Sequence, residues 1–87
     1  MAYAIGRYRV FSYPVWRREY DEKKLLLRDH GVTDTHVFYN DRDPNQVLLL
    51  FVGNDIDQLR AAWDSGVVRA WRHDAGTLDE GFFPEIP

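Results

Sequence analysis

Residues 39–55 read YNDRDPNQVLLLFVGND, and this stretch decides the fold. A polar turn, NDRDPNQ, leads into the apolar run VLLLFV, which ends at the polar residues GND. Side chains alternate across a strand. One face of this strand therefore carries Val47, Leu49 and Phe51, and the other carries Leu48, Leu50 and Val52. Both faces are apolar, so we expect the strand to be covered on both sides.

The length of the chain limits what can provide that cover. The sequence has 87 residues and no cysteine, which predicts one domain (1–87) without disulfides. A chain of this length buries only about 60% of the surface that it exposes when unfolded. Oligomerisation is a common source of further stability for so small a domain. We therefore expect one face of the strand to pack against the chain's own helices and the other to lie in a homodimer interface.

Composition and motifs exclude several classes of function. A net charge of -3 and a pI near 5.5 argue against nucleic acid or anionic membrane as a partner. The N-terminus, MAYAIGRYRVF, has no long apolar run, so we expect no signal peptide, no membrane span and a cytoplasmic location. Phosphate loops, nucleophile elbows and dinucleotide motifs are absent. The histidines share no spacing that converges on a metal, and we expect neither metal nor cofactor.

The first strand is predicted by the alternation of residues 4–11. It places Gly6 and Tyr8 on one face, and Arg7 and Arg9 on the other. The pattern alone does not say which face lies under the helices.

Two helical segments are predicted between the strands. The first begins near Pro14, a residue that fits the first turn of a helix, and ends at Gly31. The second begins at Asp55, whose spacing to Gln58 resembles a capping box, and is interrupted at 65–66. Its inward stripe consists of Leu59, Ala62, Trp63, Val67, Ala70 and Trp71.

The remaining strands complete a known arrangement. Residues 35–40 form a hairpin with the VLLLFV strand, and a short last strand lies around Phe82 and Phe83. The predicted order is β-α-β-β-α-β, a ferredoxin-like α+β fold with an antiparallel sheet. Because its helices cover one face of the sheet, the other face is left for a second subunit.

Several motifs occur in a characteristic order. Val10 precedes Tyr13-Pro14 and the pattern Trp16-x-x-x-Tyr20; a helix ending HGV and the hairpin V-[FY]-x-N-x-x-D-P-N-x-V follow. This order resembles the dimeric α+β barrel superfamily, which includes antibiotic-biosynthesis monooxygenases, stress-responsive barrel proteins and polyketide-cyclase-like small proteins. The resemblance covers nearly the whole chain. It implies a barrel of two face-to-face sheets, with a cleft between helices and sheet in each subunit that binds hydrophobic small molecules.

The resemblance also implies a function. We expect a cofactor-independent, cyclase-like enzyme of natural-product metabolism that acts on a hydrophobic, aromatic, polyketide-type substrate. A cofactor-free monooxygenase or an isomerase is an alternative within enzymes. A non-catalytic dimeric binder or carrier of a hydrophobic metabolite is an alternative outside them.

Three residues are candidates for catalysis. Lys23 lies on the same helical face as Trp16 and Tyr20, where it would act as a base or bind an anionic substrate. Alternatively, the aliphatic part of the Lys23 side chain covers apolar surface and its ammonium group reaches water. His36, on the second strand, suits proton transfer if it faces the helices, and interface packing if it faces a partner. Arg9 would stabilise an enolate.

The candidates for substrate binding are basic and aromatic. Arg7 and Arg9 together could clamp a carboxylate, phenolate or enolate, or could instead form ion pairs with acidic residues. The aromatic candidates suit planar ligands, although aromatic residues at helical spacing also build cores. They are Tyr8, Trp16, Tyr20, Tyr39, Trp63 and Trp71.

Overall fold

A computed structural model of the protein describes residues 1–73 and 76–85, without the side chains of residues 72 and 73. The order of elements is β1 (Ala2–Arg9), α1 (Tyr13–Lys23), the 3₁₀ helix η1 (Lys24–His30), β2 (Val32–Asn40), β3 (Asp43–Gly53), α2 (Ile56–Trp63), α3 (Gly66–His73) and β4 (Gly76–Pro84). This order confirms the predicted ferredoxin-like arrangement, with each helical region divided into two pieces.

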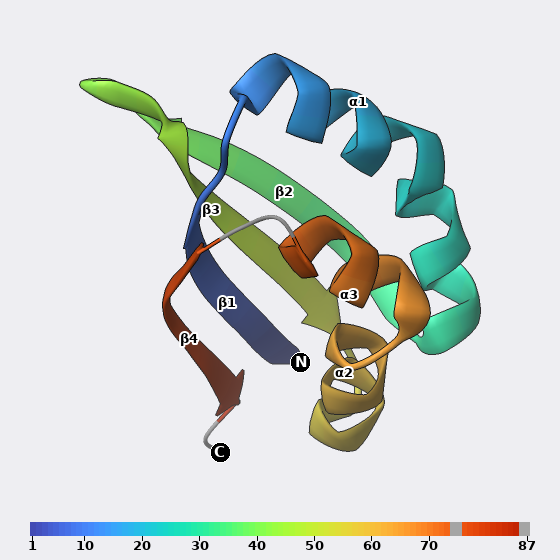
Figure 1. Ribbon diagram of the computed structural model, residues 1–87. Coiled ribbons are helices and arrows are strands. Elements are labelled where there is room, and N and C mark those ends of the chain that lie inside the picture. The colour runs from blue at the N-terminus through green and yellow to red at the C-terminus, as the bar shows by residue number, and fades with distance from the viewer. Residues whose placement is uncertain (74–75, 86–87) are drawn as a thin grey trace.

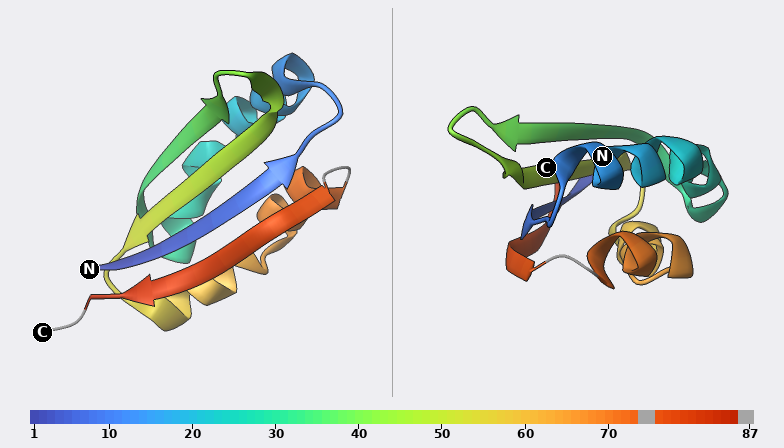
Figure 2. Two further views of the ribbon diagram at one scale, coloured as in Figure 1. Left: turned by 90° about the vertical axis from the view of Figure 1, so that its left-hand side faces the viewer. Right: turned by 45° about the horizontal axis from the view of Figure 1, so that its top comes forward.

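The four strands form one antiparallel sheet in the order β2-β3-β1-β4. All the helices lie on one side of this sheet (Figure 1). The opposite face, seen directly in the left view of Figure 2, carries no element of the described chain. We call it the open face. The prediction that helices cover only one face of the sheet is confirmed.

Both faces of β3 are apolar and differ in burial, as the sequence predicts. On the helix side Val47, Leu49 and Phe51 are each at most 1% exposed. On the open face Leu48 and Leu50 are half-buried. The neighbouring strand β1 divides in the same way: its buried residues Ala2, Ala4, Gly6 and Tyr8 face the helices, and Tyr3, Ile5, Arg7 and Arg9 face the open side.

Trp63, at the end of α2, lies at the centre of the core. Its ring contacts Phe51 at 5.0 Å, Phe82 at 5.9 Å and Tyr8 at 6.2 Å between centroids. A β-carbon at Gly6 would lie 2.6 Å from the Trp63 ring and 2.5 Å from the Tyr8 hydroxyl. The glycine therefore lets the two aromatic rings lie directly against β1.

The start of α2 and the break after it are as predicted, whereas the stripe of α3 differs. Asp55 caps α2 by accepting hydrogen bonds from the backbone N–H groups of Asp57 at 2.7 Å and Gln58 at 3.3 Å. In α3 the buried residues are Val68 and the predicted Trp71; Val67 is half-buried against the core, and Ala70 is exposed. The interruption between the two helices changes the phase of the apolar stripe, so a single helical wheel does not describe both.

The first helical region is α-helical only as far as Lys23 and continues as the 3₁₀ helix η1. Gly31 ends it with a φ of 82°, in the left-handed region. The predicted end at Gly31 is confirmed. The change of helix type, however, rotates the residues after Lys23 away from the positions of a continuous α-helix, because a 3₁₀ helix has three residues per turn.

The left-handed turn at Gly31 leads to a first prediction. Gly31→Ala should lower the free energy of unfolding by about 1–2 kcal/mol, because a side chain is disfavoured at positive φ. Its β-carbon would also lie 2.6 Å from the Gln58 side-chain oxygen. Urea unfolding followed by circular dichroism measures the change. Gly66→Ala is the matched control, since a β-carbon there meets nothing within 4 Å. Equal unfolding midpoints for Gly31→Ala and the parent would contradict this account of the turn.

Candidate functional site

Trp16, Tyr20 and Trp71 form an aromatic cluster between α1 and α3. Trp16 and Tyr20, four residues apart on α1, stack at 5.6 Å with an interplanar angle of 10°. Trp71 lies 5.1 Å from the Tyr20 ring, and its backbone carbonyl accepts a hydrogen bond from the Trp16 indole N–H at 3.2 Å. The structure thus brings together three of the aromatic residues predicted to bind substrate. A pocket opens on each side of this cluster.

The first pocket, which we call the apolar pocket, lies between the end of β1, the start of α1 and α3. Its volume is about 470 Å³. Trp16 and Trp71 form part of its wall, and Phe11, at its edge, is 93% exposed. The other lining residues are Val10, Ser12, Val15, Glu19 and Ala70. Apart from the Ser12 hydroxyl and the Glu19 carboxylate, the lining side chains are hydrophobic or aromatic.

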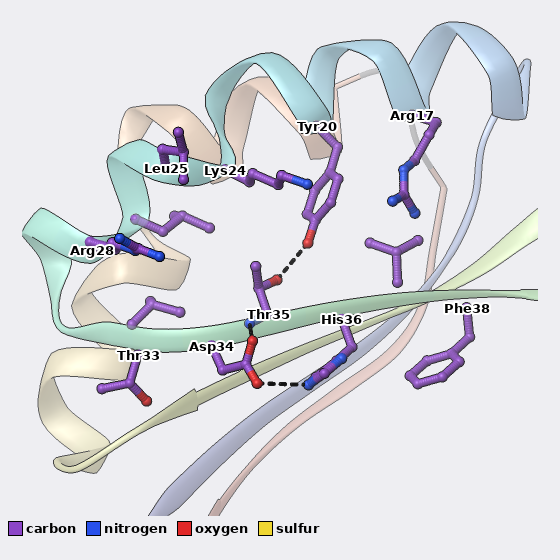
Figure 3. A pocket seen from close by; sticks show the side chains of 13 residues that line it. Arg17, Tyr20, Lys24, Leu25, Arg28, Thr33, Asp34, Thr35, His36 and Phe38 are labelled. Atoms are coloured by element: carbon purple, nitrogen blue, oxygen red, sulfur yellow. Dashed lines mark hydrogen bonds and ion pairs between the residues drawn. The ribbon is translucent and has the colours of Figure 1, made fainter.

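The second pocket, which we call the basic pocket, lies between the α1–η1 segment and β2 and has a volume of about 370 Å³ (Figure 3). Arg17, Tyr20, Lys24 and Arg28 project from the helical segment into it. From the strand below, Thr35 Oγ1 lies 2.8 Å from the Tyr20 hydroxyl. Three cations therefore line one small pocket in a chain whose net charge is -3.

The charges around the basic pocket are coupled through Asp21. Its Oδ1 accepts hydrogen bonds from Arg17 Nε at 3.2 Å and from Lys24 Nζ at 3.4 Å. Burial acts to raise the pKa of the Asp21 carboxyl, but the bonds and charges of Arg17 and Lys24 outweigh it and hold that pKa below its ordinary value. Asp21 therefore stays ionised and neutralises part of the positive charge.

Tyr20 is neutral in the physiological range. Burial raises the pKa of its phenol above the ordinary value, against the opposing effects of the Thr35 hydrogen bond and the Arg17 charge. Tyr20 therefore acts in the pocket as a hydroxyl that can donate and accept hydrogen bonds, and not as a phenolate.

No protein-family model matches the chain, and a search of curated proteins finds no match. Structural comparison finds chains of the same fold. SnoaB, a cofactor-independent oxygenase from Streptomyces nogalater, superimposes with a TM-score of 0.80 at 14% identity, over 99% of this chain and 93% of SnoaB. The chain has the fold of the antibiotic biosynthesis monooxygenases.

Two further solved structures extend the likeness. A putative antibiotic biosynthesis monooxygenase from Deinococcus radiodurans matches with a TM-score of 0.77 at 12% identity, over 100% of this chain and 94% of that one. HapK from Hahella chejuensis matches with a TM-score of 0.72 at 12% identity, over 99% and 93%. At such identities the antibiotic biosynthesis monooxygenase fold is shared, and the activity is a separate question.

Within this monooxygenase fold, Tyr8 and Trp63 occupy the space directly between the sheet and α2. Each is 1% exposed. The Tyr8 hydroxyl and the Trp63 indole N–H both donate to Glu80 Oε2, each at 3.0 Å. Tyr39 lies apart on the β2–β3 hairpin, where it contacts Tyr13 at 5.0 Å and is 56% exposed. The six predicted aromatic residues are thus divided among the aromatic cluster, the core and the hairpin.

Lys23 does not occupy the position expected from the sequence. It is exposed at the end of α1 and lines none of the pockets described here. Its neighbour Lys24 lines the basic pocket instead. Lys23 is the last residue of α1, and its φ of -115° departs from the helical value of about -63°, so the helical wheel does not hold at this residue. This corrects the expectation that Lys23 points into the cleft.

Arg7, Arg9 and His36 face the open side of the sheet. Arg7 pairs with Asp79 at 2.8 Å, and Arg9 pairs with Asp43 at 2.8 Å. A clamp formed by these arginines inside the helix–sheet cleft is therefore excluded, and the alternative of ion pairs is the observed one. His36 Nε2 lies 3.0 Å from Asp34 Oδ2, and the residue reaches the rim of the basic pocket.

The sequence reading did not identify the cations of the basic pocket. Arg17, Lys24 and Arg28 are separated by seven and four residues, which is the spacing of one helical stripe. That spacing could have identified them, with Tyr20 on the same stripe. Thr35 carried no such signal, because its role depends on the pairing of β2 with the rest of the sheet.

Among the described residues, no three His, Asp or Glu side chains come together in a group that could hold a metal ion. None of the described helices is long and apolar enough to cross a membrane.

Proposed function

We propose that this protein is a cofactor-independent enzyme of natural-product metabolism and that its hydrophobic, aromatic substrate binds in the apolar pocket. The observation that carries the proposal is the lining of that pocket, where Trp16 and Trp71 stand among hydrophobic side chains. A volume of about 470 Å³ lies within the ordinary range of ligand sites. Indole faces suit planar ring systems. The shared fold with a cofactor-independent oxygenase supports the same class of chemistry.

Two reactions fit such a site, and both begin with the loss of a proton from an activated carbon of the substrate. In a cyclisation, the resulting carbanion attacks a second carbonyl group of the same molecule, and the alkoxide that forms is protonated and eliminated as water to leave a double bond; the pocket contributes by holding the reacting ends together. In an oxygenation, dioxygen converts an activated methylene to a carbonyl with release of water, and the substrate supplies all the electrons. Of the lining residues, only Glu19 carries a carboxylate that could accept the proton.

Binding can be tested before the natural substrate is known. A panel of polycyclic phenols should quench tryptophan fluorescence, because Trp16 and Trp71 line the pocket. Val15→Asp should weaken the binding about tenfold or more, since it places a charge against the apolar ligand. The fold should be retained, because Val15 is 53% exposed. Ala61→Asp, on the exposed side of α2, is the matched control.

Turnover then separates the candidate reactions. Oxygen uptake without added flavin or metal, with a product that has gained oxygen and lost hydrogen, identifies an oxygenase. Loss of water from the substrate without oxygen uptake identifies a cyclase. Binding without either change would make the protein a carrier of a hydrophobic metabolite. Equal affinity of Val15→Asp and the parent would overturn the assignment of the pocket.

We also propose that the open face of the sheet pairs with the same face of a second copy. Its centre is apolar: Ile5 on β1 pairs with Leu50 on β3, next to Leu48 and Val52. Tyr3, Phe38 and Phe83 extend the apolar surface towards the other strands, and each is exposed in the single chain. An exposed apolar patch of this kind marks an interaction surface. A homodimer of two such faces is the barrel that the sequence resemblance implies.

A further inference from the structure

We propose that the basic pocket is a second ligand site, which binds a small amphipathic organic acid through its carboxylate. The aromatic cluster separates this site from the apolar pocket: Tyr20 lines the basic pocket, while Trp16 and Trp71 line the apolar one. The proposal therefore goes beyond the proposed enzymatic function and can fail independently of it.

The first argument is a local excess of positive charge. Arg17, Lys24 and Arg28 line the pocket. Asp21 accepts from both Arg17 and Lys24, and Asp34 is the one carboxylate within the lining. Three cations against these two carboxylates leave a positive surplus, in a chain that is negative overall. An anion entering the pocket would compensate that surplus.

The second argument is the supply of free hydrogen-bond donors. Arg28 makes no ion pair with any residue that the structure describes. The hydroxyls of Tyr20 and Thr35 lie 2.8 Å apart, so only one of their two hydrogens lies between them. The other is left for a further acceptor. A guanidinium and a hydroxyl donor facing one small space are the groups that bind a carboxylate.

The carboxylate of Asp34 pairs with groups on its own strand and not with the cations of the basic pocket. Its Oδ1 accepts from the backbone N–H of Thr35 at 2.9 Å, and its Oδ2 lies 3.0 Å from His36 Nε2. Figure 3 shows both contacts on the strand side of the pocket, away from Arg17 and Lys24. The negative charge of Asp34 is thus held by its own strand.

The apolar part of the lining describes the rest of the ligand. Leu25 is 66% exposed, and it lines the pocket together with the half-buried Val37. A fully polar anion such as phosphate would leave these side chains in water. A carboxylate on a one- or two-ring hydrocarbon body would cover them, in a volume of about 370 Å³. The lining therefore favours an amphipathic acid over an inorganic anion.

The test is isothermal titration calorimetry with 2-naphthoate and with its uncharged analogue 2-naphthamide. Naphthoate should bind about tenfold or more tightly than the amide, since hydrogen bonds to a charged group are stronger than neutral ones. Its affinity should fall as salt is added, because the cations are partly exposed. The double variant Lys24→Gln/Arg28→Gln should lose the preference for naphthoate. Arg18→Gln, an exposed arginine of α1 outside the pocket lining, is the matched control and should retain it.

Four results would overturn the second site. They are no measurable binding of naphthoate, equal affinities for acid and amide, an equal loss in Arg18→Gln and the double variant, and full binding by the double variant. If naphthoate binding is lost in Val15→Asp and retained in the double variant, the acid occupies the apolar pocket. That outcome removes the second site and supports the proposed function. Conversely, if polycyclic phenols fail to bind while naphthoate binds as described, the proposed use of the apolar pocket fails and the second site stands.

Discussion

Replacing Trp63 by alanine should lower the free energy of unfolding by about 3–5 kcal/mol, as expected for truncation of a buried aromatic side chain. Trp63 is 1% exposed and contacts rings on β1, β3 and β4 as well as the Glu80 carboxylate. A small domain has about 5–15 kcal/mol of stability in total. We therefore expect Trp63→Ala to be largely destabilised, with an unfolding midpoint far below that of the parent in urea.

A second variant keeps this prediction testable if Trp63→Ala does not fold. Trp63→Phe retains an aromatic ring in the core and loses the indole N–H that donates to Glu80 at 3.0 Å. The free energy of unfolding of Trp63→Phe should lie between those of the parent and the alanine variant, because most of the buried area is preserved. An unchanged midpoint in both variants would show that Trp63 is not at the centre of the core.

Leu50→Glu should convert the proposed homodimer to a monomer, with a dissociation constant raised about a hundredfold or more. The reason is that an unpaired charge buried in an apolar interface costs about 3–5 kcal/mol. Leu50 is half-buried on the open face, between Ile5 of β1 and His36 of β2. In a single chain this side chain reaches solvent, so the monomer should keep its fold. Native mass spectrometry and sedimentation velocity measure the assembly state, and circular dichroism measures the fold.

The control for this charge is another leucine on the opposite side of the molecule. Leu26 of η1 is 49% exposed and lies in the helical layer, so Leu26→Glu should leave the assembly unchanged. A parent protein that is monomeric at concentrations well above micromolar would contradict the dimer. Persistence of the dimer in Leu50→Glu would place its interface elsewhere on the surface.

The strands were the most predictable part of this protein, because their signals are local. The alternating residues of β1 and the two apolar faces of β3 show directly which side chains share a face of the sheet, and the structure confirms both groupings. The β2–β3 hairpin is confirmed, but its turn consists of residues 41–42 alone, because the remaining residues of the predicted DRDPNQ loop belong to β3; β2 also begins at Val32, earlier than predicted. The capping by Asp55 gives the start of α2, since it depends only on residues within one turn.

The candidate site was less predictable, because its residues depend on relations between elements. Period-2 alternation shows that Arg7 and Arg9 share a face but does not show which face lies under the helices. That choice depends on the neighbours of β1 in the sheet. The spacing of Arg17, Lys24 and Arg28 indicates one helical face, but it does not show that this face lies against β2 and forms a pocket with it.

The central position of β1 has a consequence for the order in which the chain can acquire its structure. β1 is made first, yet its neighbours in the sheet are β3 and β4, the last of which begins at Gly76. Each of these pairings closes a long loop, and such long-range contacts slow folding. During synthesis, the N-terminal strand must therefore remain unpaired until β3 follows it and cannot be enclosed until β4 has emerged. The β2–β3 hairpin, whose two strands are joined by a short turn, is the part of the sheet that can form before the rest.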